Sequence, residues 1–196
     1  MRLVLASGNA GKLGEFRQLL APLDIEVIAQ GELGIGEIEE TGLSFVENAL
    51  LKARHAARLS GLPALADDSG LCVDALDGAP GLHSARYAGA QGNNAANIAK
   101  LLGALDGVDA AGRGAFFICV LVLLRHAEDP APLIAEGRWR GRILDAPRGS
   151  GGFGYDPLFF DPALDASAAE LDAATKHRHS HRGQALRGLL AQLAAG

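Results

Sequence analysis

The feature that most constrains this chain is a continuous apolar run at residues 115–124, which lies between Arg113 and Arg125. A helix needs about 20 apolar residues to cross a bilayer, so this run is too short for one. It is rich in β-branched and aromatic residues, which favour an extended backbone. These residues are Phe116, Phe117, Ile118, Val120 and Val122. The sequence therefore predicts a buried strand over residues 113–125 and a fold built on a sheet.

Shorter apolar runs alternate with segments of helical spacing. Further strands are expected at residues 2–6, 25–29, 63–66, 71–76, 133–138 and 141–144, the last two as a meander. Helices are expected at residues 12–20, 44–60, 93–105 and 181–193. The second helix has the clearest ends, because Ser44 and Glu47 fit a capping box and Gly61 is typical of a helix stop. This order predicts an α/β fold with a mixed central sheet and flanking helices.

Length and charge limit the organisation and the partners. The 196 residues suffice for one sizeable domain or two small lobes. A net charge of −5 argues against a broad nucleic-acid-binding surface, but a local basic pocket for a small anion stays possible. We expect neither a membrane span nor a signal peptide. Cys72 and Cys119 lie in apolar runs, which predicts reduced core residues in a cytoplasmic protein.

A glycine-containing loop follows the first expected strand. It consists of Ser7, Gly8, Asn9, Ala10, Gly11 and Lys12. Glycines let backbone N–H groups approach a phosphate, the following helix contributes its dipole, and Lys12 supplies a positive charge. The loop lacks the spacing of a Walker A motif, and Leu13 stands where that motif has Ser or Thr. It is a candidate anion site, with an ordinary strand–helix turn as the alternative.

Two pairs of carboxylates are candidate ligands for a hard cation. Glu39 and Glu40 form one pair, and Asp67 and Asp68, followed by Ser69-Gly70, form the other. Mg²⁺ prefers oxygen ligands and is commonly held by one or two carboxylates together with substrate phosphates. Because neighbouring residues of an extended segment point to opposite faces, we expect one residue of each pair to face the site. Two acidic turns with local capping are the alternative.

Basic and aromatic residues provide further candidates. Lys52 lies on the expected helix at residues 44–60. Glu47 precedes it by five residues, so an ion pair at the usual spacing of four residues does not account for this lysine. Glycines surround Phe153 in the loop at residues 149–157, which would expose the ring for stacking on a base. Residues 176–182 are rich in histidine and arginine. We favour an anion or purine-edge site there, formed by His181 and Arg182, over a zinc or nickel site.

These blocks, in this order, resemble the inosine triphosphate pyrophosphatase family over nearly the whole chain. They are SGNAGK at 7–12, EETGLSFVENALLKA at 39–53, ADDSGL at 66–71, GAPGLHSARYAG at 78–89, GGFGYDP at 151–157 and SHRGQAL at 180–186. His83, His177 and His179 depart from the usual pattern of the family. The resemblance implies a single pyrophosphatase domain over residues 1–196, with two lobes that enclose a substrate cleft, and a cytoplasmic homodimer.

The resemblance also implies roles for individual residues. The loop at residues 7–12 matches the triphosphate-binding loop, and Lys12 and Lys52 match catalytic, phosphate-contacting lysines. Glu40 and Asp68 match the Mg²⁺ ligands, and Asp68 also matches the proton acceptor. Ser69 matches a substrate contact. The remaining nucleoside and base contacts are matched by Phe153, Gly154, Tyr155, Asp156, Lys176, His181 and Arg182.

The implied reaction is the Mg²⁺-dependent hydrolysis of inosine and xanthosine triphosphates, and of their deoxy forms, to a monophosphate and pyrophosphate. Asp68 would accept the proton of a water that Mg²⁺ orients toward the α-phosphorus. Such an enzyme removes deaminated purines from the nucleotide pool before they enter DNA or RNA. Two alternatives stay open: a related house-cleaning pyrophosphatase with another base preference, and a nucleotide sensor without turnover.

Overall fold

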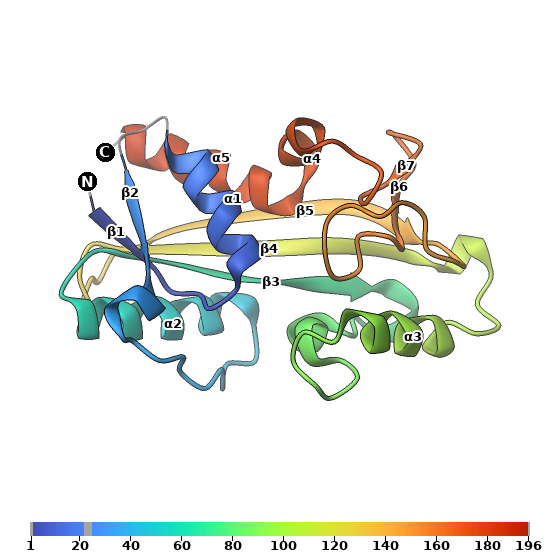
Figure 1. Ribbon diagram of the computed structural model, residues 1–196, viewed down its shortest axis with the longest axis horizontal. Coiled ribbons are helices and arrows are strands. Elements are labelled where there is room, and N and C mark those ends of the chain that lie inside the picture. The colour runs from blue at the N-terminus through green and yellow to red at the C-terminus, as the bar shows by residue number, and fades with distance from the viewer. Residues whose placement is uncertain (1, 22–24, 196) are drawn as a thin grey trace. The chain divides into compact units, whose positions relative to one another are not determined.

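The computed structural model describes residues 2–21 and 25–195, and it contains a seven-stranded sheet. The sheet has the order β2-β1-β3-β4-β5-β6-β7 (Figure 1). Its strands are β1 (Arg2–Leu5), β2 (Glu26–Ala29), β3 (Ala64–Val73), β4 (Gly114–Leu124), β5 (Leu133–Ile143), β6 (Phe159–Asp161) and β7 (Ala166–Ser167). Strand β1 pairs in parallel with β2 and β3, whereas β6 pairs antiparallel with β5 and β7. The predicted mixed sheet is therefore confirmed.

Five α-helices belong to the described chain: α1 (Ala10–Leu20), α2 (Phe45–Ser60), α3 (Asn94–Ala104), α4 (Ala173–His179) and α5 (His181–Ala195). Short 3₁₀ segments lie at Gln30–Leu33, Asp74–Leu76, Gly81–Arg86 and Ala110–Gly112. Within residues 2–21 and 25–195, no helix has both the length and the apolar character that a membrane span needs. The four helices expected from the sequence are confirmed, and α4 is an additional short one.

The chain forms two compact units. Unit 1 comprises residues 1–68, 120–136 and 186–196, and unit 2 comprises residues 69–119 and 137–185. The chain passes from one unit to the other within strands β3, β4 and β5 and within helix α5. Asp68 is thus the last residue of the first segment of unit 1, and Ser69 is the first residue of unit 2.

Unit 1 begins with two parallel crossovers around β1. Helix α1 connects β1 to β2, which pairs with one edge of β1. Helix α2 then connects β2 to β3, which pairs with the other edge of β1. Because such crossovers are right-handed, connections that run in opposite directions place their helices on opposite faces of the sheet. Figure 1 shows α1 and α2 on opposite faces of these strands. The loop after β1 therefore lies where the direction of winding changes.

Local capping explains the ends of α2. The Ser44 side chain accepts a hydrogen bond from the Glu47 backbone N–H, and Gly61 ends the helix in the left-handed region at φ 68°. The Glu47 carboxylate reaches back to accept from the N–H of Leu43 at 2.9 Å. Inside the helix, small residues such as Ala49 and Ala53 are fully buried. The Ser44 cap and the glycine stop expected from the sequence are confirmed, whereas Glu47 returns its hydrogen bond to Leu43, one residue before the cap that a capping box uses.

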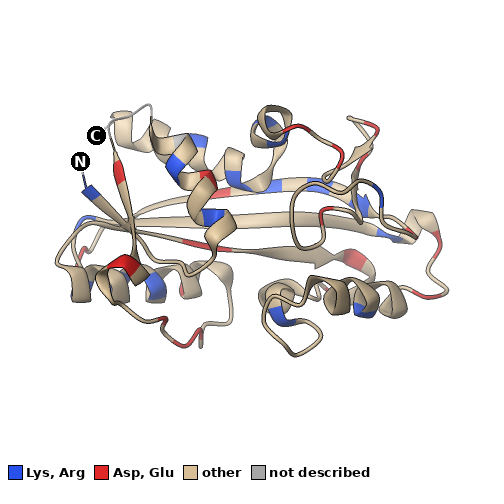
Figure 2. Ribbon diagram, in the orientation of Figure 1, with Lys and Arg blue, Asp and Glu red and all other residues tan. Residues whose placement is uncertain are grey.

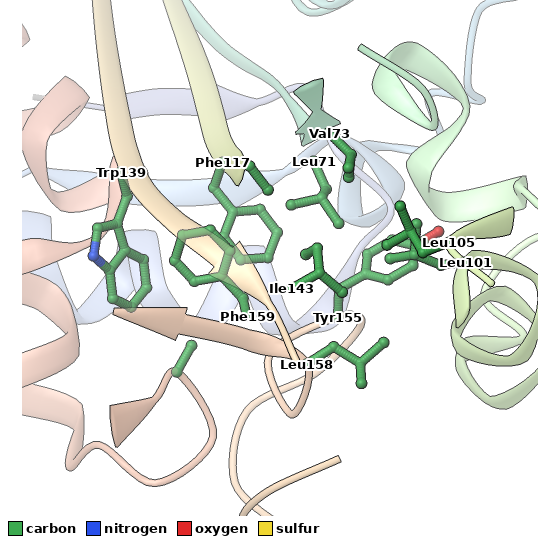
Figure 3. Packing of buried hydrophobic residues seen from close by; sticks show 12 residues of the cluster. Leu71, Val73, Leu101, Leu105, Phe117, Trp139, Ile143, Tyr155, Leu158 and Phe159 are labelled. Carbon is green, nitrogen blue, oxygen red and sulfur yellow. The ribbon is translucent and has the colours of Figure 1, made fainter. Parts of the chain in front are cut away.

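Unit 2 is organised around an aromatic cluster (Figure 3). The Phe117 ring lies 4.6 Å from the Phe159 ring and 6.4 Å from the Trp139 ring, measured between centroids. The Trp139 indole donates a hydrogen bond of 2.7 Å to the buried Asp161 carboxylate. Tyr155 packs against this cluster and is only 4% exposed. Tyr155 thereby anchors the loop at residues 149–157 to this cluster.

One prediction about β3 is wrong. The sequence predicted two strands, at residues 63–66 and 71–76, with Asp67, Asp68, Ser69 and Gly70 between them. The structure instead has one strand, Ala64–Val73, and the two aspartates lie inside it. Asp67 and Asp68 are buried but are contacted by Lys12 and Lys52. These ion pairs overcome the low strand propensity of aspartate.

The meander predicted at residues 133–138 and 141–144 is also wrong, because β5 runs unbroken from Leu133 to Ile143. Gly141 does not end the strand. A side chain there would overlap the Phe160 carbonyl and lie 2.7 Å from the Phe159 ring. The glycine therefore permits the close approach of β6, which is a common role of glycine inside a strand.

Candidate active site

The loop at residues 7–12 ends β1 and opens α1. The Asn9 side chain caps the helix, accepting a hydrogen bond of 3.0 Å from the Lys12 backbone N–H. The Asn9 backbone N–H in turn donates to the Ser7 hydroxyl at 3.2 Å. The helix begins two residues earlier than expected, because this cap lies at Asn9. The loop thus presents a helix N-terminus at the carboxyl end of β1, a place where α/β proteins bind anions.

Two lysines lie against the carboxylates of β3. Lys12 Nζ forms an ion pair with Asp67 Oδ1, whose side chain is fully buried. Lys52 Nζ forms ion pairs with Asp68 Oδ1 at 2.7 Å and with Glu40 Oε1 at 2.8 Å. Figure 2 shows the acidic positions of β3 and the basic positions of α1 and α2. Unit 1 therefore brings together the loop and all four charged residues predicted for it, and adds Asp67.

Burial determines the electrostatics of this cluster. It raises the pKa of the Asp68 carboxyl, and the attraction of the Lys52 ammonium only partly opposes this effect. Burial lowers the pKa of the Lys52 ammonium, but the neighbouring carboxylates of Asp68 and Glu40 outweigh this effect, and the net result is a raised lysine pKa. Lys52 therefore remains charged. A carboxylate with a raised pKa is a better proton acceptor near neutral pH.

The carboxylates of Glu40 and Asp68 fit a hard cation. Both accept a hydrogen bond from the same Lys52 Nζ, so they converge on one positively charged atom. Over the described parts of the chain, no three His, Cys, Asp or Glu residues form a group that could hold a metal. Two carboxylates, completed by phosphate and water oxygens, match the usual way in which proteins bind Mg²⁺.

Unit 2 contains the residues predicted to contact the nucleoside. Phe153 is 40% exposed, and its backbone N–H donates a hydrogen bond of 2.7 Å to Asp156 Oδ2. Lys176 Nζ donates to the same oxygen at 2.6 Å and lies 5.3 Å from the centre of the Phe153 ring. Gly152 has φ +72°, and a side chain there would collide with Asp156. Asp156 thus joins the loop to α4 and leaves the aromatic ring exposed.

Tyr155 differs from Phe153 in its surroundings. Its ring packs in the core of unit 2, and its hydroxyl donates a hydrogen bond of 2.9 Å to the Ser84 carbonyl. Burial raises the Tyr155 pKa far above its usual value, so the phenol stays neutral. Of the two aromatic residues in the loop, Phe153 is the one that offers a ring face for stacking.

The start of α5 provides the last predicted residues. His181 is buried, and its ring stacks on Phe117 with 4.9 Å between centroids and 18° between planes. Arg182 Nη2 donates to the Ser69 hydroxyl at 3.3 Å, and its Cζ lies 6.0 Å from the centre of the Phe153 ring. Ser69, Phe153, Lys176 and Arg182 are therefore neighbours within unit 2, although they are far apart in the sequence.

Asp67 is the residue that the sequence analysis did not assign to the site. We expected one residue of each acidic pair to face the site, and the structure shows that Asp67 contacts Lys12 whereas Asp68 contacts Lys52. Their alternation on one strand explains this result, since each carboxylate meets the helix on its own face of the sheet. The signal was present in the sequence as two adjacent acidic residues directly after an apolar run.

The fold and the two groups of side chains define a class: an α/β protein with a capped helix N-terminus after β1, two lysines paired with buried carboxylates and an exposed aromatic ring. The chain belongs to the Ham1 family, whose model matches residues 3–192. It is 64% identical over 193 residues to a dITP/XTP pyrophosphatase of Xanthomonas oryzae pv. oryzae. The aligned residues cover 98% of this chain and 97% of the relative. A dITP/XTP pyrophosphatase of Halorhodospira halophila is 60% identical over 195 residues, which cover 100% of this chain and 98% of that protein.

A solved structure shows the same fold. The HAM1 protein from Coxiella burnetii has a TM-score of 0.93 and 52% sequence identity, and the match covers 100% of both chains. The likeness extends over β1 to α5, so it includes every element that carries a predicted site residue.

Proposed function

We propose that this protein is a nucleoside-triphosphate pyrophosphatase that hydrolyses dITP, XTP and related non-standard purine nucleotides to a monophosphate and pyrophosphate. The observation that carries the proposal is the contact of Lys52 with both Glu40 and Asp68, in the same unit as the loop and Lys12. This cluster contains a proton acceptor, two cations for phosphate oxygens and a pair of carboxylates for a metal. The names of the full-length relatives support the same activity.

The phosphate chain carries about four negative charges, which the protein must offset. Lys12, Lys52 and the N–H groups at the start of α1 bind phosphate oxygens and align the chain. Glu40 and Asp68 would hold Mg²⁺, which supplies further positive charge for the phosphates when bound. Positive groups placed before the reaction stabilise the charge that develops on the leaving pyrophosphate.

Hydrolysis requires a proton acceptor for the attacking water. The water oxygen forms a bond to the α-phosphorus while the bond from that phosphorus to the bridging oxygen of pyrophosphate breaks. Asp68 accepts the proton of the water, for which its raised pKa is suited. Lys52 stays protonated beside Asp68 and holds the carboxylate in position.

The residues of unit 2 would bind the nucleoside. The exposed face of Phe153 stacks on the base, and Asp156 fixes the backbone that presents this ring. Arg182 and His181 supply donors for an oxygen at position 6 of the purine. Ser69, Gly154, Tyr155 and Lys176 complete the predicted contacts with the nucleoside.

Several finer assignments are part of the same proposal. The whole chain, residues 1–196, works as one pyrophosphatase domain, which is supported by a family match over residues 3–192. Mg²⁺ is the metal, and the active form is a cytoplasmic homodimer. Cys72 and Cys119 are buried, and neither forms a disulfide bond.

A substrate panel tests the proposal. Pyrophosphate release is measured with Mg²⁺ for dITP, XTP, dATP, dGTP and a modified pyrimidine triphosphate. We expect the highest kcat/KM for dITP and XTP. A preference for the pyrimidine would favour another house-cleaning pyrophosphatase. Tight binding of dITP without pyrophosphate release would identify a sensor.

A further inference from the structure

Adjacent aspartates on β3 serve two different lysines. Asp67 contacts Lys12 of α1, whereas Asp68 contacts Lys52 of α2. Because side chains alternate along a strand, the two carboxylates leave β3 on opposite faces, and each meets the helix that covers its face. Only Asp68 has a role in the function proposed above. The burial of Asp67 therefore needs an explanation of its own.

Stability alone does not explain a carboxylate at this position. The side chain of Asp67 is 0% exposed, and Leu65, two residues earlier on the same face of β3, is also fully buried. An apolar residue in such a place avoids the cost of removing a charge from water. An ion pair of this kind is often no more stabilising than apolar packing, which favours a role for Asp67 through its contact with Lys12.

Lys12 needs a fixed position for its task. It is the third residue of α1, and its side chain is 16% exposed. A lysine has a long flexible side chain with many rotamers, so a free ammonium spends little time in any one place. The buried carboxylate of Asp67 holds the ammonium next to the loop that caps α1, before any ligand arrives. Fixing a group in advance lowers the entropy that binding must overcome.

We propose that Asp67 is the positioning residue of Lys12 and that it acts on the triphosphate only through this lysine. The inference rests on the proposed function, since it takes the loop at residues 7–12 as the phosphate site. Asp67 accepts one hydrogen bond from the Lys12 ammonium, which has three N–H groups and so retains donors for phosphate oxygens.

A double-mutant cycle tests this assignment. The variants are Asp67→Asn, Lys12→Met and the double variant. Asp161→Asn is the matched control, because Asp161 is another buried aspartate but bonds to Trp139 in unit 2. Each protein is titrated calorimetrically with inorganic tripolyphosphate in the absence of metal. Each is also assayed for kcat and KM with dITP and Mg²⁺.

We expect Asp67→Asn and Lys12→Met each to weaken tripolyphosphate binding about tenfold or more, which corresponds to the loss of one charge-assisted hydrogen bond. The double variant should bind no more weakly than Lys12→Met alone. With dITP, Asp67→Asn should act mainly on KM, whereas Asp161→Asn should leave both constants unchanged.

Two results would overturn the inference: additive losses in the double variant, or tighter tripolyphosphate binding by Asp67→Asn. The latter would mean that Asp67 merely repels the anion. If Asp67→Asn does not fold, Asp67→Glu takes its place in the cycle, because it keeps the charge but displaces it. A wild-type protein that neither binds tripolyphosphate nor cleaves dITP would refute the proposed function as well, whereas additive losses in an active enzyme refute only the role of Asp67.

Discussion

Replacing Asp68 with asparagine separates its chemical role from its structural one. The amide has nearly the same shape and still accepts a hydrogen bond from Lys52 Nζ, which lies 2.7 Å from the carboxylate oxygen. It cannot accept the proton of the attacking water. Loss of a general base lowers the rate by about 10²–10⁴-fold, which is about 2.7–5.4 kcal/mol of transition-state free energy.

The stability of the Asp68→Asn variant should change little. Burial raises the Asp68 pKa, so the folded state gains little from the negative charge. We expect a change in melting temperature of less than about 4 °C, which corresponds to about 1 kcal/mol for a chain of this length. Calorimetry measures this change, and pyrophosphate release from dITP measures the rate.

Glu40→Gln is the matched control for Asp68→Asn. It removes the same charge from the other carboxylate that contacts Lys52. Because Glu40 is proposed only as a metal ligand, its variant should need more Mg²⁺ but regain activity when the metal is saturating. Asp68→Asn should stay inactive under those conditions. If it kept more than a tenth of the wild-type kcat, Asp68 would not be the base, and Glu40 would be the first candidate.

Three further predictions concern the base, the metal and the fold. Arg182→Ala should reduce the preference for ITP over ATP more than the preference for ITP over GTP, since guanine shares the oxygen at position 6. The measurement is kcat/KM for the three nucleotides with both proteins. An unchanged ratio of kcat/KM for ITP to that for ATP would refute the role of Arg182. The double variant His177→Ala and His179→Ala should keep the requirement for Mg²⁺ or Mn²⁺ in the same assay, and loss of that requirement would place the metal at the histidines. Gly141→Ala should destabilise the protein by about 1–3 kcal/mol in thermal unfolding, because its Cβ would overlap β6. The control Gly14→Ala, in a helix with no atom within 4 Å of the added Cβ, should not destabilise it.

The elements that the sequence predicted well are those with local signals. Ser44 and Gly61 define the ends of α2 through contacts within a few residues of each helix end. The strand at Gly114–Leu124 follows from a continuous run of apolar residues, almost all of which are buried. The loop at residues 7–12 was recognisable because its glycines lie at the junction of a strand and a helix. Such features depend on neighbouring residues and need no knowledge of the rest of the fold.

The elements that the sequence predicted wrongly depend on distant partners. The sequence predicted that a short strand ends at Asp67 and Asp68, and aspartate is indeed uncommon inside strands. Lys12, 55 residues before Asp67, and Lys52, 16 residues before Asp68, neutralise the two carboxylates and allow β3 to continue. The strand break predicted between residues 138 and 141 is likewise absent, and it is the close approach of β6 that requires a glycine at position 141.

The sequence by itself determined which chemical groups the protein has, together with the capped helices and the glycine-containing loop that carry several of them. Only the tertiary structure decided which lysine meets which carboxylate. That pairing follows from the winding of unit 1, where β1 lies between β2 and β3 and the crossovers put α1 and α2 on opposite faces. Because side chains alternate along β3, Asp67 meets the lysine of one helix and Asp68 the lysine of the other.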